Sequence, residues 1–172
     1  MALPVKLDRV HYYRIAGRYI FAGDLFVSRG RIYFFPEVDL AEQRREVYEI
    51  LPHQFALVGL VVIYLAQNLK SYASRNELWE DGISNEQFQK KADAYIAVLK
   101  EERKEKGFSQ SLPLPTRVNA DELTNIRLGP TGKLSFLAQS DNHDFNIGLR
   151  RKKRLHDALW EAGLITPSSM CD

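Results

Sequence analysis

The chain has 172 residues, of which 45% are hydrophobic and 27% charged, and its formal net charge is +2 at pH 7. This length is enough for one domain with its own core. The composition excludes extended disorder and the strongly basic profile of a general nucleic-acid coat protein. The single cysteine, Cys171, excludes an internal disulfide and a cysteine-based metal site, which fits a reducing compartment.

The first segment, about residues 10–39, predicts β-strands. Residues 24–28 and 31–35 are rich in β-branched and aromatic side chains and flank a glycine-containing turn, which is typical of a hairpin. Pro36 is expected to end the second strand. Alternation distributes the apolar side chains over both faces: Leu25 and Val27 share one face, Ile32 and Phe34 do likewise, and Phe26, Tyr33 and Phe35 occupy the other faces. Both faces of the hairpin are therefore expected to be covered.

The middle segment, residues 40–107, predicts helices. Residues 41–50 are rich in helix-forming side chains, and a later helix is expected to follow Ser84 and to stop at Gly107. Ser84 and Gln87 have the spacing of a capping box, in which Ser84 caps the backbone and Gln87 reaches back. Apolar side chains at helical spacing predict the buried stripe of this helix: Phe88, Ala92, Ile96 and Leu99, widened by Tyr95.

Residues 51–69 contain no Asp, Glu, Lys or Arg, and this run of nineteen residues approaches the roughly 20 that span a bilayer. Polar residues near both ends shorten the strongly apolar part of this run. Its remaining length is about 10–14 residues, which is typical of a buried core helix. A single crossing would also place the two strand-rich ends on opposite sides of a membrane. The sequence therefore favours a buried helix, with residues 55–69 as a packing or homo-oligomer surface, over a membrane-associated helix or a true span.

The last segment, residues 112–164, returns to strands and ends in a helix. A short strand is expected at residues 124–128 and a turn at residues 129–132. A turn at residues 140–143 separates two strands with matching apolar faces: Leu134, Phe136 and Ala138 on the first, and Phe145, Ile147 and Leu149 on the second. A helical stripe that can cover this sheet follows: Leu155, Ala158, Leu159 and Ala162.

Five consecutive basic residues open this last helix: Arg150, Arg151, Lys152, Lys153 and Arg154. Removing these five charges from the net charge of +2 leaves −3, so the rest of the chain is mildly acidic. A helix N-terminus already carries about half a positive charge, and a bound anion would relieve the repulsion. We therefore predict that this basic run is an anion-binding or partner-binding patch. Trp160, beside the polar face of the helix, is expected to belong to it.

The position of each basic side chain follows from the helical register. Counted back from the apolar stripe, Arg151 and Lys152 fall near its extension, whereas Arg150, Lys153 and Arg154 point to solvent. The alternative to a binding patch is a solvated run, in which Lys153 pairs with Asp157 four residues later. The helix can also begin later and leave the first two basic residues in a loop.

A strand pair, a later hairpin and a C-terminal amphipathic helix, in this order, resemble pleckstrin-homology-like (PH-like) domains, including the GRAM branch. Residues 23–35 (GDLFVSRGRIYFF) resemble the strand pair in which these domains have a G-x-L-x-V-T-x-x-R-I-x-F pattern. Residues 133–136 and 144–147 resemble their later strands. The resemblance implies an α+β fold, with a PH-like antiparallel small barrel or curved sheet and a C-terminal capping helix.

The resemblance also implies a division of the chain. Residues 1–40 and 112–166 would be the two halves of one β domain. Residues 41–111 would be a helical insertion between them, and residues 167–172 a tail.

PH-like domains are binding modules for lipid headgroups or protein segments, so the resemblance implies a binding protein rather than an enzyme. We expect a cytoplasmic binding or scaffolding module, with membrane association as a further option. Its basic patch would contact a protein partner or an anionic membrane surface, and nucleic acid is disfavoured. No catalytic residue, cofactor or metal site is predicted, since the four histidines have no His or Cys neighbour at ligand spacing. The first ten residues predict no secretory signal.

Two alternatives to this function are left open. The first is an enzyme of unknown reaction, whose site would lie between the helical insertion and the sheet. The second is a membrane-inserted protein that uses residues 51–69.

Overall fold

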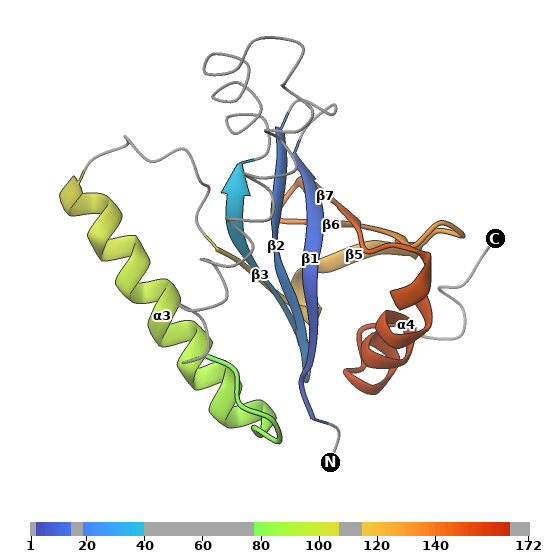
Figure 1. Cartoon of the computed structure of the whole chain (residues 1–172), viewed down its shortest axis with the longest axis horizontal. Helices are drawn as coiled ribbons and strands as arrows, with labels where there is room; N and C mark the ends of the chain where they lie inside the picture. Colours follow the sequence, from blue (N-terminus) through green and yellow to red (C-terminus); the bar gives the residue numbers. More distant parts are fainter. Residues whose placement is uncertain (1–2, 15–18, 40–77, 107–114, 166–172) are drawn as a thin grey trace, which may run out of the picture.

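The computed structural model describes residues 3–14, 19–39, 78–106 and 115–165. Its elements in chain order (Figure 1) are β1 (Val5–Arg14), β2 (Tyr19–Ser28), β3 (Arg31–Asp39), α3 (Asn85–Lys106), β4 (Thr116–Asn119), the 3-10 helix η1 (Ala120–Glu122), β5 (Leu123–Leu128), β6 (Lys133–Ala138), β7 (Asp141–Asn146), the 3-10 helix η2 (Leu149–Arg151) and α4 (Lys152–Glu161). The seven strands and the two helices α3 and α4 confirm the predicted α+β class.

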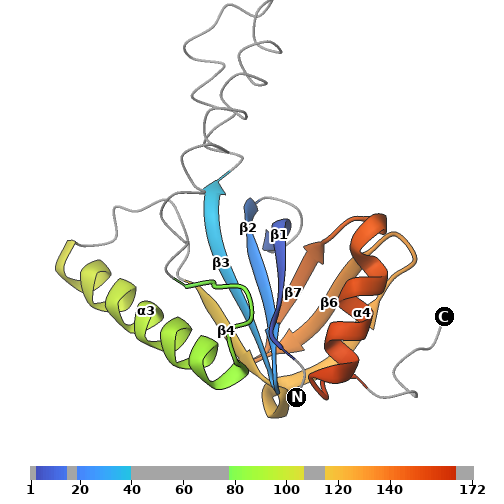
Figure 2. The same ribbon diagram turned by 60° about the horizontal axis from the view of Figure 1, so that its bottom comes forward.

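All seven strands pair antiparallel in one sheet, in the order β4-β3-β2-β1-β7-β6-β5. The strands of the two chain ends meet where β1 pairs with β7 and Tyr12 lies opposite Phe145. The sheet is not closed into a barrel, because β4 and β5 lie at its edges. These edge strands are joined by the three residues of η1, a link that reaches at most about 14 Å. The two edges therefore come together at one corner, and the sheet is strongly curved (Figure 2).

One face of the curved sheet holds the larger core, and α4 packs against it. Its buried side chains come from both halves of the sheet and from α4: Leu7, Val10, Tyr12, Phe21, Leu25, Val27, Ile32, Phe34, Val118, Leu134, Phe136, Ala138, Phe145, Ile147, Leu155, Ala158, Leu159 and Leu164. The predicted stripe of the last helix therefore covers the sheet. The predicted inward faces of the β2–β3 hairpin and of β6 are also confirmed.

The opposite face of β2 and β3 is covered by α3, so that the two helices lie on opposite sides of these strands (Figures 1 and 2). The core between them contains Phe26, Tyr33, Phe35, Leu78, Ile83, Phe88, Ala92 and Ile96. The Phe88 ring centroid lies 4.9 Å from that of Phe26 and 5.5 Å from that of Tyr33. Both faces of the β2–β3 hairpin are buried, as the alternation of its side chains predicts.

The capping box predicted before α3 is present. The Gln87 N–H donates a hydrogen bond to the Ser84 hydroxyl oxygen at 3.2 Å, and the Ser84 N–H donates to the Gln87 side-chain oxygen at 3.4 Å. α3 then runs to Lys106, next to the predicted stop at Gly107.

β3 continues to Asp39 and does not end at Pro36, so this prediction is wrong. Pro36 lies opposite Gly23, at a register shift between Ala22 and Gly23. A proline has no N–H for the hydrogen-bond ladder, and a bulge is one of the places where a strand tolerates it. A Cβ atom on Gly23 would lie 2.2 Å from the Phe35 carbonyl oxygen, so the two backbones can approach this closely only at a glycine.

The hairpin of β6 and β7 turns at Gln139 and Ser140, and not at residues 140–143 as predicted. Both turn residues have a positive φ, 51° and 71°, which suits a two-residue hairpin turn. His143 therefore lies within β7 and is only 8% exposed.

The helix predicted at residues 41–50 and the apolar stretch at residues 51–69 lie outside the described residues. The roles proposed for residues 55–69, an oligomer surface or a membrane contact, therefore stay predictions. Within the described part of the chain, no helix combines the length and the apolar character needed to cross a membrane.

Candidate functional site

A tight turn, held in place by its neighbours, connects β7 to the basic run. Gly148 has a φ of 81° and directs the chain into η2. Its N–H donates a hydrogen bond to the side-chain oxygen of Asn146 at 3.2 Å. A Cβ atom on Gly132 would come within 2.7 Å of the Gly148 carbonyl oxygen, so the β5–β6 turn packs directly against this segment. Because the chain turns here, Leu149 does not lie on the apolar face of β7. The prediction that Leu149 continues the face formed by Phe145 and Ile147 is therefore wrong.

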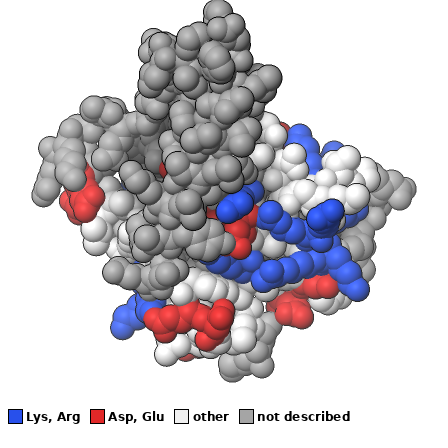
Figure 3. All heavy atoms as spheres, in the orientation of Figure 1, with Lys and Arg blue, Asp and Glu red and all other residues white. Residues whose placement is uncertain are grey.

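The five basic residues lie in η2 and the first turn of α4. Arg150 and Arg151 belong to η2, and the α-helix begins at Lys152, later than the run itself. Arg150, Lys153 and Arg154 are exposed, whereas Arg151 and Lys152 are half-buried, as the helical register predicts. The first turn of α4 contains no acidic residue. Figure 3 shows Lys and Arg side chains gathered over β1 and α4.

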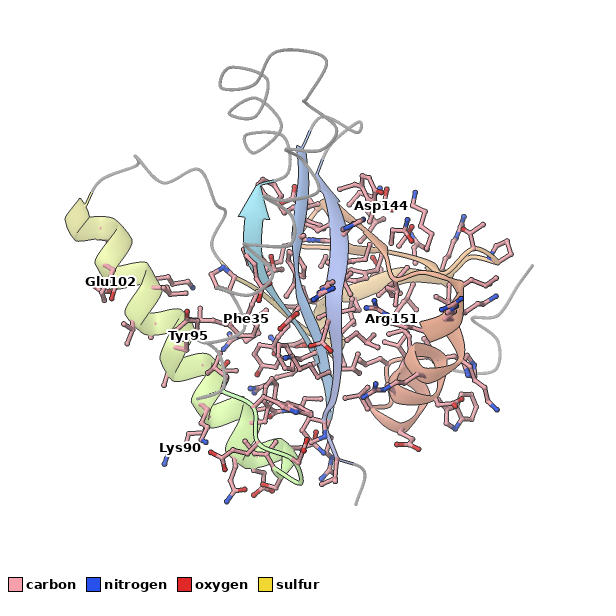
Figure 4. All side chains as sticks on the ribbon, in the orientation of Figure 1. Phe35, Lys90, Tyr95, Glu102, Asp144 and Arg151 are labelled. Carbon is pink, nitrogen blue, oxygen red and sulfur yellow. The ribbon has the colours of Figure 1, made fainter. Side chains whose placement is uncertain are left out.

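Arg151 extends from the start of α4 toward the sheet (Figure 4). Its guanidinium donates a hydrogen bond to the backbone carbonyl oxygen of Asp8 in β1. Burial lowers the pKa of His11, and the positive charge of Arg151 lowers this pKa further. Arg151 is therefore an internal contact between α4 and β1, a role that no sequence pattern indicates.

Replacing Arg151 with glutamine should raise the pKa of His11 toward its ordinary value of 6.5, because the nearby charge is lost while burial stays. An NMR titration of the His11 ring protons measures this. The pKa of His11 is lower in the folded than in the unfolded protein. The contribution of His11 to the free energy of unfolding is therefore fully present above pH 6.5, and it is lost as the pH falls through the folded pKa. That loss should be smaller in Arg151→Gln. Arg154→Gln, which removes an exposed charge, serves as the control. An unchanged His11 pKa in Arg151→Gln would contradict the close approach of the Arg151 guanidinium to β1.

Three acidic side chains of β1, β2 and β7 are paired with other cations. Lys6 lies 2.8 Å from Asp8 and 3.2 Å from the buried Asp24. Burial lowers the pKa of Lys6, but the two carboxylates together raise it above its ordinary value. Lys133 pairs with Asp144 at 3.1 Å. These carboxylates are therefore already engaged by cations outside the basic run.

Within the described residues, none of the five basic side chains forms an ion pair, and Arg151 is engaged instead by the backbone carbonyl oxygen of Asp8. The alternative pairing of Lys153 with Asp157 is not formed, and Asp157 lies instead 3.2 Å from the His156 Nδ1 atom. The positive charge at the start of α4 is thus not compensated by the described part of the fold.

Two large apolar side chains are exposed on the same segment as these cations, one just before the basic run and one near the end of α4. Trp160, which the sequence placed beside the polar face, is 47% exposed. Leu149 is 70% exposed, and sequence reasoning missed it because the alternation of β7 was extended beyond the end of the strand. The glycine before Leu149 is the only signal that could have indicated the change of direction.

A buried polar pair lies in the core on the α4 side of the sheet, where the sequence predicted only a turn. The Tyr12 hydroxyl and the His143 Nδ1 atom are 3.0 Å apart. The His143 ring also stacks on the rings of Tyr12 and Phe136, with centroid distances of 5.8 and 5.2 Å. The pair is enclosed by aromatic side chains and contributes to the core.

A second polar cluster joins α3 to the sheet. Asp93 accepts hydrogen bonds from the Arg31 guanidinium at 3.0 Å and from the Tyr33 hydroxyl at 3.2 Å, and it lies 3.4 Å from Arg117. Burial is the main cause of the raised pKa of Tyr33. Each group is engaged within the fold, so the cluster positions α3. In none of the described regions do three His, Cys, Asp or Glu side chains gather as a metal site would require.

No family model, curated protein or solved structure matches this chain. Fold and site together define a class: an α+β protein whose open, curved, seven-strand antiparallel sheet is covered by a C-terminal helix with a basic start.

Proposed function

We propose that this protein is a non-enzymatic binding module of the PH-like type, and that the basic start of α4 contacts an anionic partner. One observation carries the proposal. Arg150, Lys153 and Arg154 are exposed at a helix start with no acidic residue in its first turn, and they form no ion pair with the described residues. The helix dipole repels these cations, and an anion bound among them would remove the repulsion.

The chain order of the elements supports the PH-like part of the proposal. Three long strands come first, a final hairpin of β6 and β7 follows, and the amphipathic α4 ends the fold by covering the sheet. This is the order on which the resemblance rests. The open sheet corresponds to the curved-sheet form of that expectation.

The contact between α3 and the sheet favours a binding module over an enzyme with a site there. In the described part of this contact, Phe88 and Ala92 are fully buried and Ile96 is 7% exposed. Among the titratable groups of this contact, Arg31 is paired with Asp93 at 3.0 Å, and Tyr33 donates a hydrogen bond to the same carboxylate. Among the described residues, apolar side chains occupy the contact between α3 and the sheet.

Neutralising three charges in the variant Arg150→Gln/Lys153→Gln/Arg154→Gln should weaken binding to immobilised heparin, a soluble polyanion. The expected loss is about tenfold at low salt, since three exposed ion pairs each contribute a fraction of a kcal/mol. Elution from a heparin column at lower salt measures this loss, and the difference should shrink as salt screens the charges.

The matched control is Lys90→Gln/Lys100→Gln/Lys104→Gln, which removes three exposed charges from α3 and changes the net charge equally. It should elute like the unmodified protein. If both triple variants elute at the same reduced salt, net charge and not the start of α4 determines binding, and the proposal fails.

A further inference from the structure

Leu149 and Trp160 are two of the four large hydrophobic side chains that are exposed in the described part of the chain. Both lie on the short segment that carries the basic run, and Leu149, at 70%, is the most exposed of the four. Moving a leucine side chain from water to an apolar environment is favourable by about 1.5–3 kcal/mol. A partner with an apolar layer would gain this free energy at Leu149.

Trp160 shares one side of α4 with a cation, and Leu149 is exposed at the start of the same segment. Lys153 and Trp160 are seven residues apart, a spacing that recurs on one side of an α-helix, whereas Leu149 lies in the preceding 3-10 helix η2. All three are exposed, whereas Leu155 and Leu159, on the core side of α4, are fully buried. Lys153 and Trp160 are about 10 Å apart along the axis, at a rise of about 1.5 Å per residue. We call these three residues the outward ridge.

The start of the outward ridge is fixed by backbone hydrogen bonds. The Ile147 N–H donates to the Gly132 carbonyl oxygen at 3.0 Å, and the Arg151 N–H donates to the Gly148 carbonyl oxygen at 3.2 Å. Arg151 also binds β1 through its guanidinium. Leu149, which lies between these anchors, is held in an outward position by the fold.

The positive charge is concentrated at the Leu149 end of the outward ridge. Arg150 and Arg154 are exposed beside it, whereas the exposed acidic residues of α4, Asp157 and Glu161, lie on its later turns. An anionic surface therefore approaches most favourably at the start of the helix, where the apolar side chain is also most exposed. Charge and apolar exposure indicate the same point of contact.

We propose that the outward ridge docks on the surface of an anionic lipid bilayer. Leu149 enters the apolar boundary below the headgroups, Arg150, Lys153 and Arg154 contact anionic headgroups, and Trp160 lies at the interface. The proposal rests on the binding function proposed above and names its partner. An acidic protein segment could satisfy the cations, whereas a bilayer has a negative surface with an apolar layer directly beneath it and so also accommodates the exposed Leu149.

Sedimentation of the full chain with phosphatidylcholine vesicles, with and without phosphatidylserine, tests this docking. The protein should pellet with the anionic vesicles only, and less so at high salt. Leu149→Ser should bind these vesicles about tenfold more weakly, because the gain from burying leucine is lost. Val98→Ser, which changes an apolar side chain that is 54% exposed on α3, should bind like the unmodified protein.

Tryptophan emission gives a second measurement. Transfer of Trp160 from water to the interface should shift the emission to shorter wavelength when anionic vesicles are added, and Trp160→Phe should remove this shift. Trp79 packs against Phe26 and Phe88 and should not respond.

The outcomes separate this inference from the proposed function. If the protein is retained on heparin but binds no vesicles, the anion-binding function stands, docking on a bilayer is overturned, and an acidic protein segment becomes the partner to seek. If Leu149→Ser binds anionic vesicles as well as the unmodified protein, the contact is purely electrostatic and insertion of Leu149 is overturned. If the unmodified protein binds neither heparin nor vesicles, the proposed function fails, and the docking proposal fails with it.

Discussion

Replacing Gly23 with alanine should lower the free energy of unfolding by about 3 kcal/mol or more, one of the two largest effects that we expect from a single substitution. The added Cβ would lie 2.2 Å from the Phe35 carbonyl oxygen and 2.9 Å from the Pro36 Cα. Both are backbone atoms, so no side-chain rotation relieves the clash, and β2 and β3 must move apart. Since both faces of these strands are buried, the movement would disturb both cores. Urea denaturation followed by circular dichroism measures the change.

Gly129→Ala is the matched control for this effect. The nearest atom to a Cβ at Gly129 is the Lys133 carbonyl oxygen, at 3.5 Å, which is an ordinary van der Waals contact. The same glycine-to-alanine change should therefore alter the free energy of unfolding by less than about 1 kcal/mol. Similar destabilisation by both substitutions would show that the close approach of the backbones at Gly23 is not the cause.

The faces of the strands and helices were predictable because they depend on local periodicity. Side chains alternate along a strand, so the apolar run of β3 had to supply two cores, with Ile32 in one and Tyr33 in the other. The capping box of Ser84 and Gln87 is equally local, since both partners lie within four residues. The exposure of Trp160 likewise followed from helical phase alone.

The wrong predictions concern residues whose environment is set by distant parts of the chain. Pro36 is accommodated within a strand because it faces a glycine, Gly23, on another strand. His143 is buried in a strand because the Tyr12 hydroxyl, 131 residues earlier, lies within hydrogen-bonding distance of it. No local pattern contains these pairings, because they depend on the register of strands that meet only in the folded sheet.

The candidate site shows the same division between local and distant causes. The sequence identified all five cations of the basic run, and the helical register predicted which of them are exposed. It could not show that the Arg151 guanidinium donates a hydrogen bond to the carbonyl oxygen of Asp8, 143 residues away. It also could not show that Leu149 is exposed beside the cations, which depends on Gly148 and on the packing of Gly132 against it.

Truncating Phe88 to alanine should destabilise the protein by about 3–5 kcal/mol, the range observed for buried Phe-to-Ala substitutions. Phe88 is fully buried, and its ring centroid lies 4.9 Å from that of Phe26, 5.5 Å from that of Tyr33 and 6.0 Å from that of Trp79. Its removal leaves a cavity among rigid rings that cannot easily collapse into it. Val98→Ala, on the same helix but at a position that is 54% exposed, should change the free energy of unfolding by less than about 0.5 kcal/mol.

The Phe88 substitution also tests whether α3 and the sheet unfold as one unit. In a Trp160→Phe background, Trp79 emission reports on the contact with α3, while circular dichroism reports on the whole protein. If α3 is an integral layer of the fold, Phe88→Ala should move both denaturation curves together to lower urea, because Phe26 and Tyr33 belong at once to this core and to the central strands. If the Trp79 transition moves alone, α3 is an accessory that leaves the sheet intact when it detaches. In that case the core between α3 and the sheet contributes little to the stability of the fold.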